Sequence, residues 1–241
     1  MVVHAALAVL LSRLSGTDDI AVGTPIAGRG ESALDDLVGM FVNTLVLRAD
    51  VRADSSFTDL LAAVRESDLQ AFAHADVPFE RLVEVLDPPR STARHPLFQV
   101  GFSFQNVTPT SIELPGLSIA PVELEHRTSQ FDLHWIVQDE YDETGAAAGM
   151  SGFVTYASAL FDEAGVTVFA DRFVRLLEAL VANPAAAVGD LQIIADTERR
   201  RIIHDFNDSD HKAAPATLVS LFDAQVAATP DALALDAPAR G

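Results

Sequence analysis

Apolar and polar residues follow two different periods along the chain, and these periods predict helices and strands. Residues 1–15 are apolar almost throughout and end at Gly16, which is typical of a buried helix closed by a glycine. Helical spacing of apolar residues also marks 57–72, 78–86, 163–182, 196–203 and 217–228. Alternation or short apolar runs predict strands at 20–22, 40–47, 97–104, 131–137 and 152–156. Long helices mixed with strands of both kinds predict a layered α/β fold.

Three of the predicted strands carry further detail. Residues 40–47 (MFVNTLVL) are apolar on both faces, which predicts a central strand. Its polar exceptions, Asn43 and Thr44, then need partners, because an unpaired buried polar group costs about 1–3 kcal/mol. The other two strands alternate, so each is expected to place its apolar side chains on one face: Phe98, Val100, Phe102 and Phe104 in one, and Phe131, Leu133, Trp135 and Val137 in the other.

The sequence also marks where helices and a linker begin. Ser56 and Asp59 have the spacing of a capping box, and Asp162 is placed to cap the helix that follows it. Pro78 opens a short helix, since proline suits a first helical turn. The polar stretch 204–215 is interpreted as a linker.

Composition narrows the classes of function. The 241 residues include 35 Asp and Glu against 16 Lys and Arg, a formal net charge of −19, and no cysteine. The acidic balance disfavours nucleic-acid binding. The lack of cysteine excludes disulfides, Cys-ligated zinc, iron–sulfur clusters and a cysteine nucleophile. No apolar run reaches the about 18 residues that would span a membrane. We therefore expect a soluble, cytoplasmic protein with no membrane or nucleic-acid partner.

Three local patterns resemble chemical motifs without meeting their requirements. Gly28–Ala33 fits a dinucleotide-binding G-x-G-x-x-A, yet the next predicted strand begins too soon for a crossover helix. Residues 149–152 (GMSG) do not make a nucleophile elbow, because that motif needs a glycine at position 153, where Phe153 stands. The linker gathers residues of metal-ligand type, but such residues in a polar linker are usually solvated, and we predict no metal site. These residues are His204, Asp205, Asp208, Asp210 and His211.

Residues 74–80 (HADVPFE) combine an aromatic residue, a proline and three titratable groups. One interpretation is a polar cluster of His74, Asp76 and Glu80. The other, which physics alone favours, is a corner between two helices with Asp76 as a cap. Two arginines within 90–95 are interpreted as pairing with local acids. These patterns alone predict no active site.

Six stretches, taken together and in order, carry a more specific signal. Three of them are GMFVNTLVLR (39–48), HADVPFERLVEVL (74–86) and RSTARHPLFQV (90–100). DDIAVGTPIAGR (18–29) precedes these, and SQFDLHWIV (129–137) and GFVTYASALFD (152–162) follow them. Their order, spacing and content resemble the later part of the condensation domains of nonribosomal peptide synthetases. In addition, residues 217–235 (TLVSLFDAQVAATPDALAL) are similar to the opening of an adenylation domain.

The chain departs from this family in an informative way. The family's signature is HHxxxDG, whose second histidine is taken as catalytic, and this chain has neither adjacent histidines nor an Asp-Gly pair. In the family that motif lies before the region where this chain starts, and the chain opens inside a predicted helix. The resemblance thus implies one lobe, the C-terminal one, of the chloramphenicol-acetyltransferase-like fold, with a mixed sheet packed with helices. We expect this lobe over 1–193, a short helix and linker over 194–216, and an incomplete adenylation domain over 217–241.

The resemblance implies amide-bond formation between carrier-bound aminoacyl and peptidyl thioesters. No cofactor would bind directly, because the substrates ride on phosphopantetheine arms of partner carrier domains. The expected partners are the N-terminal lobe, upstream and downstream carrier domains, and an adenylation domain in cis. The loop after Arg29 would floor the tunnel between the lobes, and a segment near 138–153 would cross to the other lobe. Without HHxxxDG, we predict that the chain alone is inactive and holds no catalytic residue.

The resemblance also carries motif and tunnel positions to this chain. Asn43 is the leading tunnel-side polar candidate, although it is equally interpreted as a residue that pairs with backbone and holds the fold. Ser91, Ala93 and His95 stand where the family often has Asp, Ser and Asn, which puts their roles in doubt. The full set of candidates is Arg29, Gly39, Phe41, Asn43, Thr44, His74, Asp76, Pro78, Phe79, Glu80, Arg90, Arg94, Pro96, Leu97, Phe98 and Trp135.

Two alternatives stay open beside the truncated condensation domain. One is a non-catalytic module of the same superfamily that recruits a carrier or another partner. The other is an unrelated acyltransferase of that superfamily. The adenylation-like stretch 217–235 disfavours both. A lone lobe would also expose an apolar face, so we expect self-association or poor solubility, and a loosely held tail over 217–241.

Overall fold

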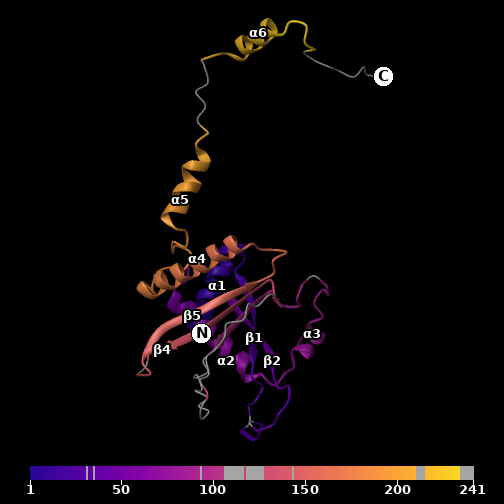
Figure 1. The fold of residues 1–241 in the computed structure, drawn as a ribbon, viewed down its shortest axis with the longest axis vertical. Helices are drawn as coiled ribbons and strands as arrows, with labels where there is room; N and C mark the ends of the chain where they lie inside the picture. Colours follow the sequence, from indigo (N-terminus) through magenta and orange to yellow (C-terminus); the bar gives the residue numbers. More distant parts are fainter. Residues whose placement is uncertain are drawn as a thin grey trace, which may run out of the picture. The chain divides into compact units, whose positions relative to one another are not determined.

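The structure is a computed structural model of the 241-residue chain. It describes residues 1–30, 32–34, 36–92, 94–105, 117, 128–142, 144–209 and 215–233. The chain divides into two compact units, Met1–Ile194 and Ala195–Gly241. The first unit holds the sheet and the packed helices (Figure 1).

One mixed five-stranded sheet organises the first unit, as expected for an α/β fold. Its strands lie in the order β2-β1-β3-β4-β5. The parallel pairs are β1 with β3 and β3 with β4, and the antiparallel pairs are β1 with β2 and β4 with β5. The strands are β1 (Asp19–Ile26), β2 (Asn43–Asp50), β3 (Val100–Gln105), β4 (Leu133–Tyr141) and β5 (Ala147–Tyr156).

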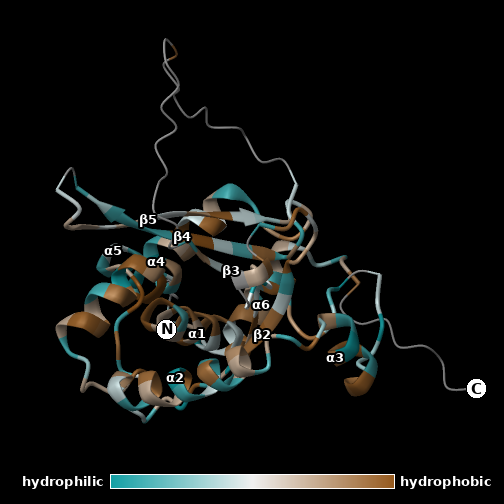
Figure 2. Cartoon of the chain, turned by 90° about the horizontal axis from the view of Figure 1, so that it is seen from below, coloured by the Kyte–Doolittle hydropathy of each residue, from teal (hydrophilic) through white to brown (hydrophobic). Residues whose placement is uncertain are grey.

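Three helices cover one side of this sheet (Figure 2). They are α1 (Val2–Ser15), α2 (Phe57–Ala73) and α4 (Glu163–Ala182). The short α3 (Phe79–Leu86) contacts β2, and the single-turn η1 (Ser32–Leu34) lies between β1 and β2. Because β1 and β2 are antiparallel, the loop that contains Gly28 and η1 is not a dinucleotide-binding crossover.

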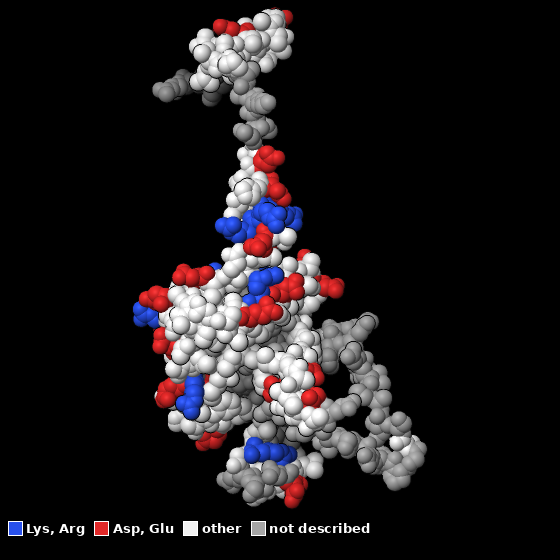
Figure 3. All heavy atoms as spheres, turned by 90° about the vertical axis from the view of Figure 1, so that its left-hand side faces the viewer, with Lys and Arg blue, Asp and Glu red and all other residues white. Residues whose placement is uncertain are grey.

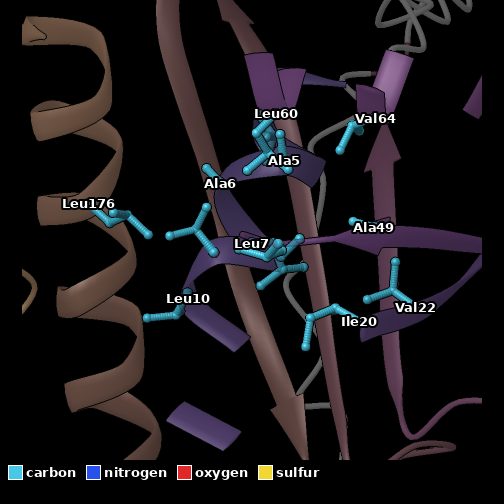
Figure 4. Packing of buried hydrophobic residues seen from close by; sticks show 14 of the residues in the cluster. Ala5, Ala6, Leu7, Leu10, Ile20, Val22, Ala49, Leu60, Val64 and Leu176 are labelled. Atoms are coloured by element: carbon cyan, nitrogen blue, oxygen red, sulfur yellow. The ribbon is translucent and has the colours of Figure 1, made fainter. Parts of the chain in front are cut away.

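The core is built around α1, which contacts α2, α4 and β1. Every side chain from Ala5 to Leu10 is fully buried, which is typical of a helix that is apolar all round. Figure 4 shows Leu10 and Ala6 of α1 facing Leu176 of α4, with the residues of the sheet on the other side. Gly16 ends the helix in a left-handed conformation with φ of 71°, as its sequence predicts.

Most predicted helix boundaries are confirmed. Ser56 caps α2 and accepts a hydrogen bond from the backbone amide of Asp59. Asp162 caps α4 in the same way through the amide of Gly165. Pro78 precedes α3, and the chain leaves that helix through a left-handed Asp87 with φ of 40°.

The prediction of a central strand over 40–47 is wrong. β2 begins at Asn43 and forms an edge of the sheet. Met40 and Val42 lie before it and are 86% and 54% exposed. The apolar run 40–47 is therefore not a strand that is buried on both faces. Two other strands are longer than predicted, since β1 and β5 extend to Asp19–Ile26 and Ala147–Tyr156.

The predicted face of Phe98 and Phe131 is also wrong. Both residues lie just before their strands, and Phe98 follows Leu97, whose φ is 70°. The ring of Phe98 therefore lies over Gly23, on the sheet face opposite the helices. Trp135 occupies the predicted face, where its ring is 4.9 Å from that of Phe173.

The second unit holds α5 (Asp196–Ile203), η2 (Asp205–Asn207) and α6 (Leu218–Ala228). Thr217 caps α6 through a reciprocal capping box with Ser220. Asp210 and His211 lie outside the described residues. Within the described part of the chain, no group of three or more His, Asp or Glu could hold a metal, and no helix is long and apolar enough to cross a membrane.

Candidate functional site

Some of the predicted site residues lie where the loop after β1 meets β2 and the segment before α3. Asn43, the first residue of β2, joins these parts. Its Nδ2 donates to the carbonyl oxygens of Ala75 at 3.0 Å and Val77 at 2.8 Å. Its Oδ1 accepts from the backbone amides of Thr44 at 2.9 Å and Phe79 at 3.1 Å. Asn43 therefore clamps the segment 74–79 and pairs with backbone, as one of the two interpretations predicts.

This clamp corrects the prediction that Asp76 caps α3. The helix has no side-chain cap from its own segment, and its first amide, that of Phe79, is satisfied by Asn43 from β2. His74, Asp76 and Glu80 are all exposed, and among the described residues their side chains form no hydrogen bond with one another. The structure thus gives no support to a polar cluster there.

Arg29 holds the loop between β1 and β2. Its guanidinium carbon is 4.3 Å from the ring centroid of Phe41, a cation–π distance, and it donates to the carbonyls of Leu34 and, at 2.7 Å, Leu37. Gly28 has φ of 64° and packs against the carbonyl of Phe41, where a side chain would collide. Gly39 is exposed beside the same ring.

The same loop presents apolar side chains outward. Val38 and Met40 are 103% and 86% exposed, and Leu37 and Val42 are also exposed. An exposed apolar stretch of this kind is typical of a surface that binds another protein or domain. The loop is therefore held by the contacts that Arg29 makes within it, while its apolar side chains are exposed.

An aromatic cluster lies on the sheet face opposite the helices and collects further predicted residues. Phe98 is its buried centre, 4.2 Å from the ring of His95 and 5.3 Å from that of Phe131. Phe79 of α3 packs on its edge at 5.8 Å. The turn through Pro96 and Leu97 positions this cluster, since a hydrogen bond of 2.9 Å joins His95 Nδ1 to the carbonyl of Pro96.

Three other predicted residues, Arg90, Arg94 and Trp135, are not among the rings that form this cluster. Arg90 and Arg94 are exposed, and within the described chain neither forms an ion pair, so the pairing with local acids is not found. Ala93 lies outside the described residues. Trp135 lines a groove of about 620 Å³ between α4 and the β4–β5 hairpin, and its buried Nε1 has no partner among the described residues.

Ser103 and His134 form a polar pair beside the aromatic cluster. Ser103 Oγ lies 2.8 Å from His134 Nε2, across neighbouring strands β3 and β4. Burial lowers the pKa of His134 below its ordinary value of 6.5, so the neutral ring is favoured in the folded chain.

The free energy of unfolding is expected to decrease as the pH is lowered, because of His134. As the pH drops below about 6.5, the unfolded chain takes up a proton that the folded ring resists, so the free energy of unfolding decreases down to the lower folded pKa. His134→Gln keeps a side chain that can hydrogen-bond Ser103 and is expected to show a smaller loss between pH 7.5 and 5. Urea unfolding monitored by the single Trp measures this, with exposed His74→Gln as control. Identical pH slopes for wild type and His134→Gln would contradict the assignment.

Sequence reasoning missed a buried pair, His4 and Asp68. His4 Nδ1 lies 3.1 Å from Asp68 Oδ2, and the residues are 1% and 2% exposed. The sequence does indicate that both residues are buried. Asp68 continues the stripe of Phe57, Leu60 and Val64 at helical spacing. His4 lies in the first turn of an otherwise apolar helix. A titratable residue on an apolar stripe is buried and needs a partner.

The surface electrostatics match the composition. Figure 3 shows acidic side chains distributed over the face of the molecule in view, with few basic ones between them. One basic group in α5, Arg199–Arg201, belongs to the second unit. No broad basic surface of the kind that binds nucleic acid is seen on that face.

Comparison with known proteins connects this arrangement to a family. The family model for the condensation domain matches residues 1–203. The chain is 45% identical over 239 residues to a probable non-canonical nonribosomal peptide synthetase, CymA, of Salinispora arenicola, and 42% identical over 235 residues to a dimodular nonribosomal peptide synthase of Bacillus subtilis. Both matches cover 98% of this chain but only 3% and 10% of those relatives.

Solved structures agree with the family and the fold. The X-domain from teicoplanin biosynthesis has a TM-score of 0.72 and 33% identity, over 80% of this chain and 43% of that chain. The four-domain nonribosomal peptide synthetase holo-AB3403 has a TM-score of 0.72 and 25% identity, over 82% of this chain and 16% of that one. The chain therefore belongs to the condensation-domain family of nonribosomal peptide synthetases and has its chloramphenicol-acetyltransferase-like α/β fold.

Proposed function

We propose that the chain is the C-terminal lobe of an amide-forming condensation domain, with residues 194–216 as linker and 217–241 as the start of an adenylation domain. The observation that carries this is coverage: four-fifths of the chain superposes on 43% of the X-domain chain, as one lobe of two would. The matches to synthetases also run through 98% of the chain, tail included.

The local geometry supports a role as one wall of a substrate tunnel. Arg29 contacts Phe41 and a backbone carbonyl of the same loop, and the apolar side chains of this loop are exposed. Such a loop is suited to form the floor of a tunnel that a second lobe closes. The β4–β5 hairpin also exposes Tyr141, Met150 and Phe153, in the segment proposed to cross to the other lobe. In this role the chain binds no cofactor itself, and the partners are carrier domains whose phosphopantetheine arms bring the two thioesters.

Catalysis by such a wall is positional. An amine and a thioester held in reacting geometry gain most of their rate from proximity. The histidine that would assist proton transfer is the second one of HHxxxDG, a motif that this chain lacks. The chain alone is therefore expected to form no dipeptide from loaded carriers.

The test joins this chain to the N-terminal lobe of the condensation domain of the Bacillus subtilis relative. Dipeptide formation from loaded carriers is followed by mass spectrometry, with the intact relative as positive control and an alanine at the second histidine of HHxxxDG as negative control. Activity of the joined protein and none of the separate chain is expected. Dipeptide from the separate chain, or a folded joined protein that is inactive while the relative is active, would overturn the proposal.

A second candidate function has its own observation. One solved structure similar to this chain, at 33% identity and a TM-score of 0.71, is a complex of the X-domain and OxyB from teicoplanin biosynthesis. A non-catalytic module that recruits a partner is thus an alternative. It is favoured if the joined protein binds a carrier or partner enzyme but forms no dipeptide.

A further inference from the structure

The strand β5 is an edge of the sheet that carries no protection against further pairing. It is the last strand of the described sheet, where its one neighbour is β4 (Figure 2). Edge strands usually carry charges or proline, which keep another strand from adding to them. β2, at the other edge, contains Arg48 and Asp50, but the sequence of β5 (AAGMSGFVTY) contains neither a charge nor a proline. The outer side of β5 is therefore suited to receive a further strand.

The groove beside α4 follows the edge of this strand. β5 contributes the consecutive residues Met150 to Val154, and then Tyr156, to the lining of this groove of about 620 Å³. Consecutive residues of a strand point to opposite faces, so the lining includes the backbone edge of β5 and not one face alone. The strand is exposed from Ala147 to Phe153. A helix in this groove has no free backbone groups to pair with β5, whereas an added strand pairs along its length.

The two walls of the groove have similar lengths. On α4 the lining extends from Glu163 to Glu178, about 22 Å at about 1.5 Å per residue. On β5 it extends from Met150 to Tyr156, about 20 Å at about 3.3 Å per residue. An extended segment of about seven residues therefore fits the groove, with alternate side chains between β5 and α4. The apolar residues of α4 that would meet them are Val166, Ala170, Phe173, Val174 and Leu177.

The charges at the groove favour a basic segment. Among the described residues that line it, the charged ones are Glu163 and Glu178, which lie at opposite ends of the α4 wall. A second copy of this chain is disfavoured as the partner, because its β5 brings no basic residue and each copy has a formal net charge of −19.

We propose that β5 and α4 bind an extended segment of another protein, which adds to the sheet as a strand. The segment has alternating apolar residues, which enter the groove, and a basic residue at each end, which meets Glu163 or Glu178. The proposal does not rest on condensation activity. Its test uses binding alone, so its failure would leave the proposed function unchanged.

The first test measures the binding of capped peptides to the 241-residue chain at pH 7.5 by calorimetry. The probe is KVTVTVTVK, and the control EVTVTVTVE keeps its apolar residues but reverses the charge of its ends. The probe is expected to bind at least about tenfold more tightly than the control at low salt, because attraction at both ends becomes repulsion. The fluorescence of Trp135, the single Trp of the chain, is expected to change on binding, because Trp135 lines the groove.

Backbone methylation tests whether the peptide adds as a strand. Alternate N–H groups of a strand point to opposite edges, so KVTVTVTVK is N-methylated either on its valines or on its threonines. One variant is expected to lose at least about tenfold in affinity, and the other to bind within about threefold of the parent peptide. Hydrogen exchange over 147–156 is expected to slow at least about tenfold when the unmodified peptide is bound, and exchange over 43–50 in β2 to stay unchanged.

Two matched variants locate the site. Val174 and Val181 are both exposed on α4, at 55% and 71%, and of the two only Val174 lines the groove. Val174→Gln is expected to weaken the binding of KVTVTVTVK at least about threefold, because an apolar contact is lost, whereas Val181→Gln leaves it unchanged. The chain joined to an N-terminal lobe, as in the test of the proposed function, is expected to bind the peptide as tightly as the separate chain.

The results that would overturn the proposal are specific. They are no binding of KVTVTVTVK, equal binding of the basic and acidic peptides, equal effects of the two methylation patterns, unchanged exchange over 147–156, and insensitivity to Val174→Gln. A dimer in which these amides are already protected would assign the edge of β5 to a second copy. Loss of peptide binding in the joined protein would assign it to the other lobe. Both of these results would also overturn the proposal.

Discussion

Asn43→Ala is expected to release the segment 74–79 and the beginning of α3 from the sheet. The alanine removes two donors to the carbonyls of Ala75 and Val77 and the acceptor that caps the Phe79 amide. At about 0.5–1.5 kcal/mol for each hydrogen bond, and with water replacing some of them at this half-buried position, the local loss is about 2–3 kcal/mol. Hydrogen exchange measured on peptides over 75–86 is therefore expected to accelerate at least tenfold.

Two further variants separate the parts of this clamp. Asn43→Asp keeps an acceptor for the Phe79 amide but loses the donor to the two carbonyls, so an intermediate acceleration is expected. Asn207→Ala removes an amide that makes two similar bonds in the second unit and serves as the control. Unchanged exchange over 75–86 in Asn43→Ala would show that other contacts hold α3 in place.

Sequence patterns predicted the helices better than the sheet. α1 and α4 are found where their apolar spacing and terminal residues placed them, because helix periodicity and capping are local properties. The strand at 40–47 was misplaced because an apolar run does not tell buried strand from exposed loop. Met40 and Val42 belong to that apolar run and are exposed.

In the candidate site, too, sequence patterns did not predict contacts between residues far apart in the chain. The resemblance named Asn43 and residues of the segment 74–79 as separate candidates, and only the structure shows that the amide of Asn43 binds this segment and replaces the cap expected from Asp76. His4 and Asp68 were missed because they are 64 residues apart, and their pairing depends on how α1 packs against α2. Contacts of that kind are set by tertiary packing.

The close approach of Phe98 to Gly23 predicts the largest effects on stability. A Cβ at Gly23 would overlap three atoms of the Phe98 ring, and this ring is 1% exposed between His95, Phe79 and Phe131. Gly23→Ala is therefore expected to destabilise the first unit by about 2–3 kcal/mol through overpacking, and Phe98→Ala by about 3–5 kcal/mol through a cavity.

The two changes are expected not to add. Once the ring is removed, the methyl group at residue 23 occupies vacated space, so Gly23→Ala in the Phe98→Ala background should cost less than about 0.5 kcal/mol. Urea unfolding followed by the fluorescence of Trp135, which is buried in the first unit, measures all four corners of the cycle. Gly30→Ala, where no atom lies near the new methyl group, is the matched control and should change stability by less than about 0.5 kcal/mol. Additive losses would mean that the cost of Gly23→Ala does not arise from overlap with the ring of Phe98.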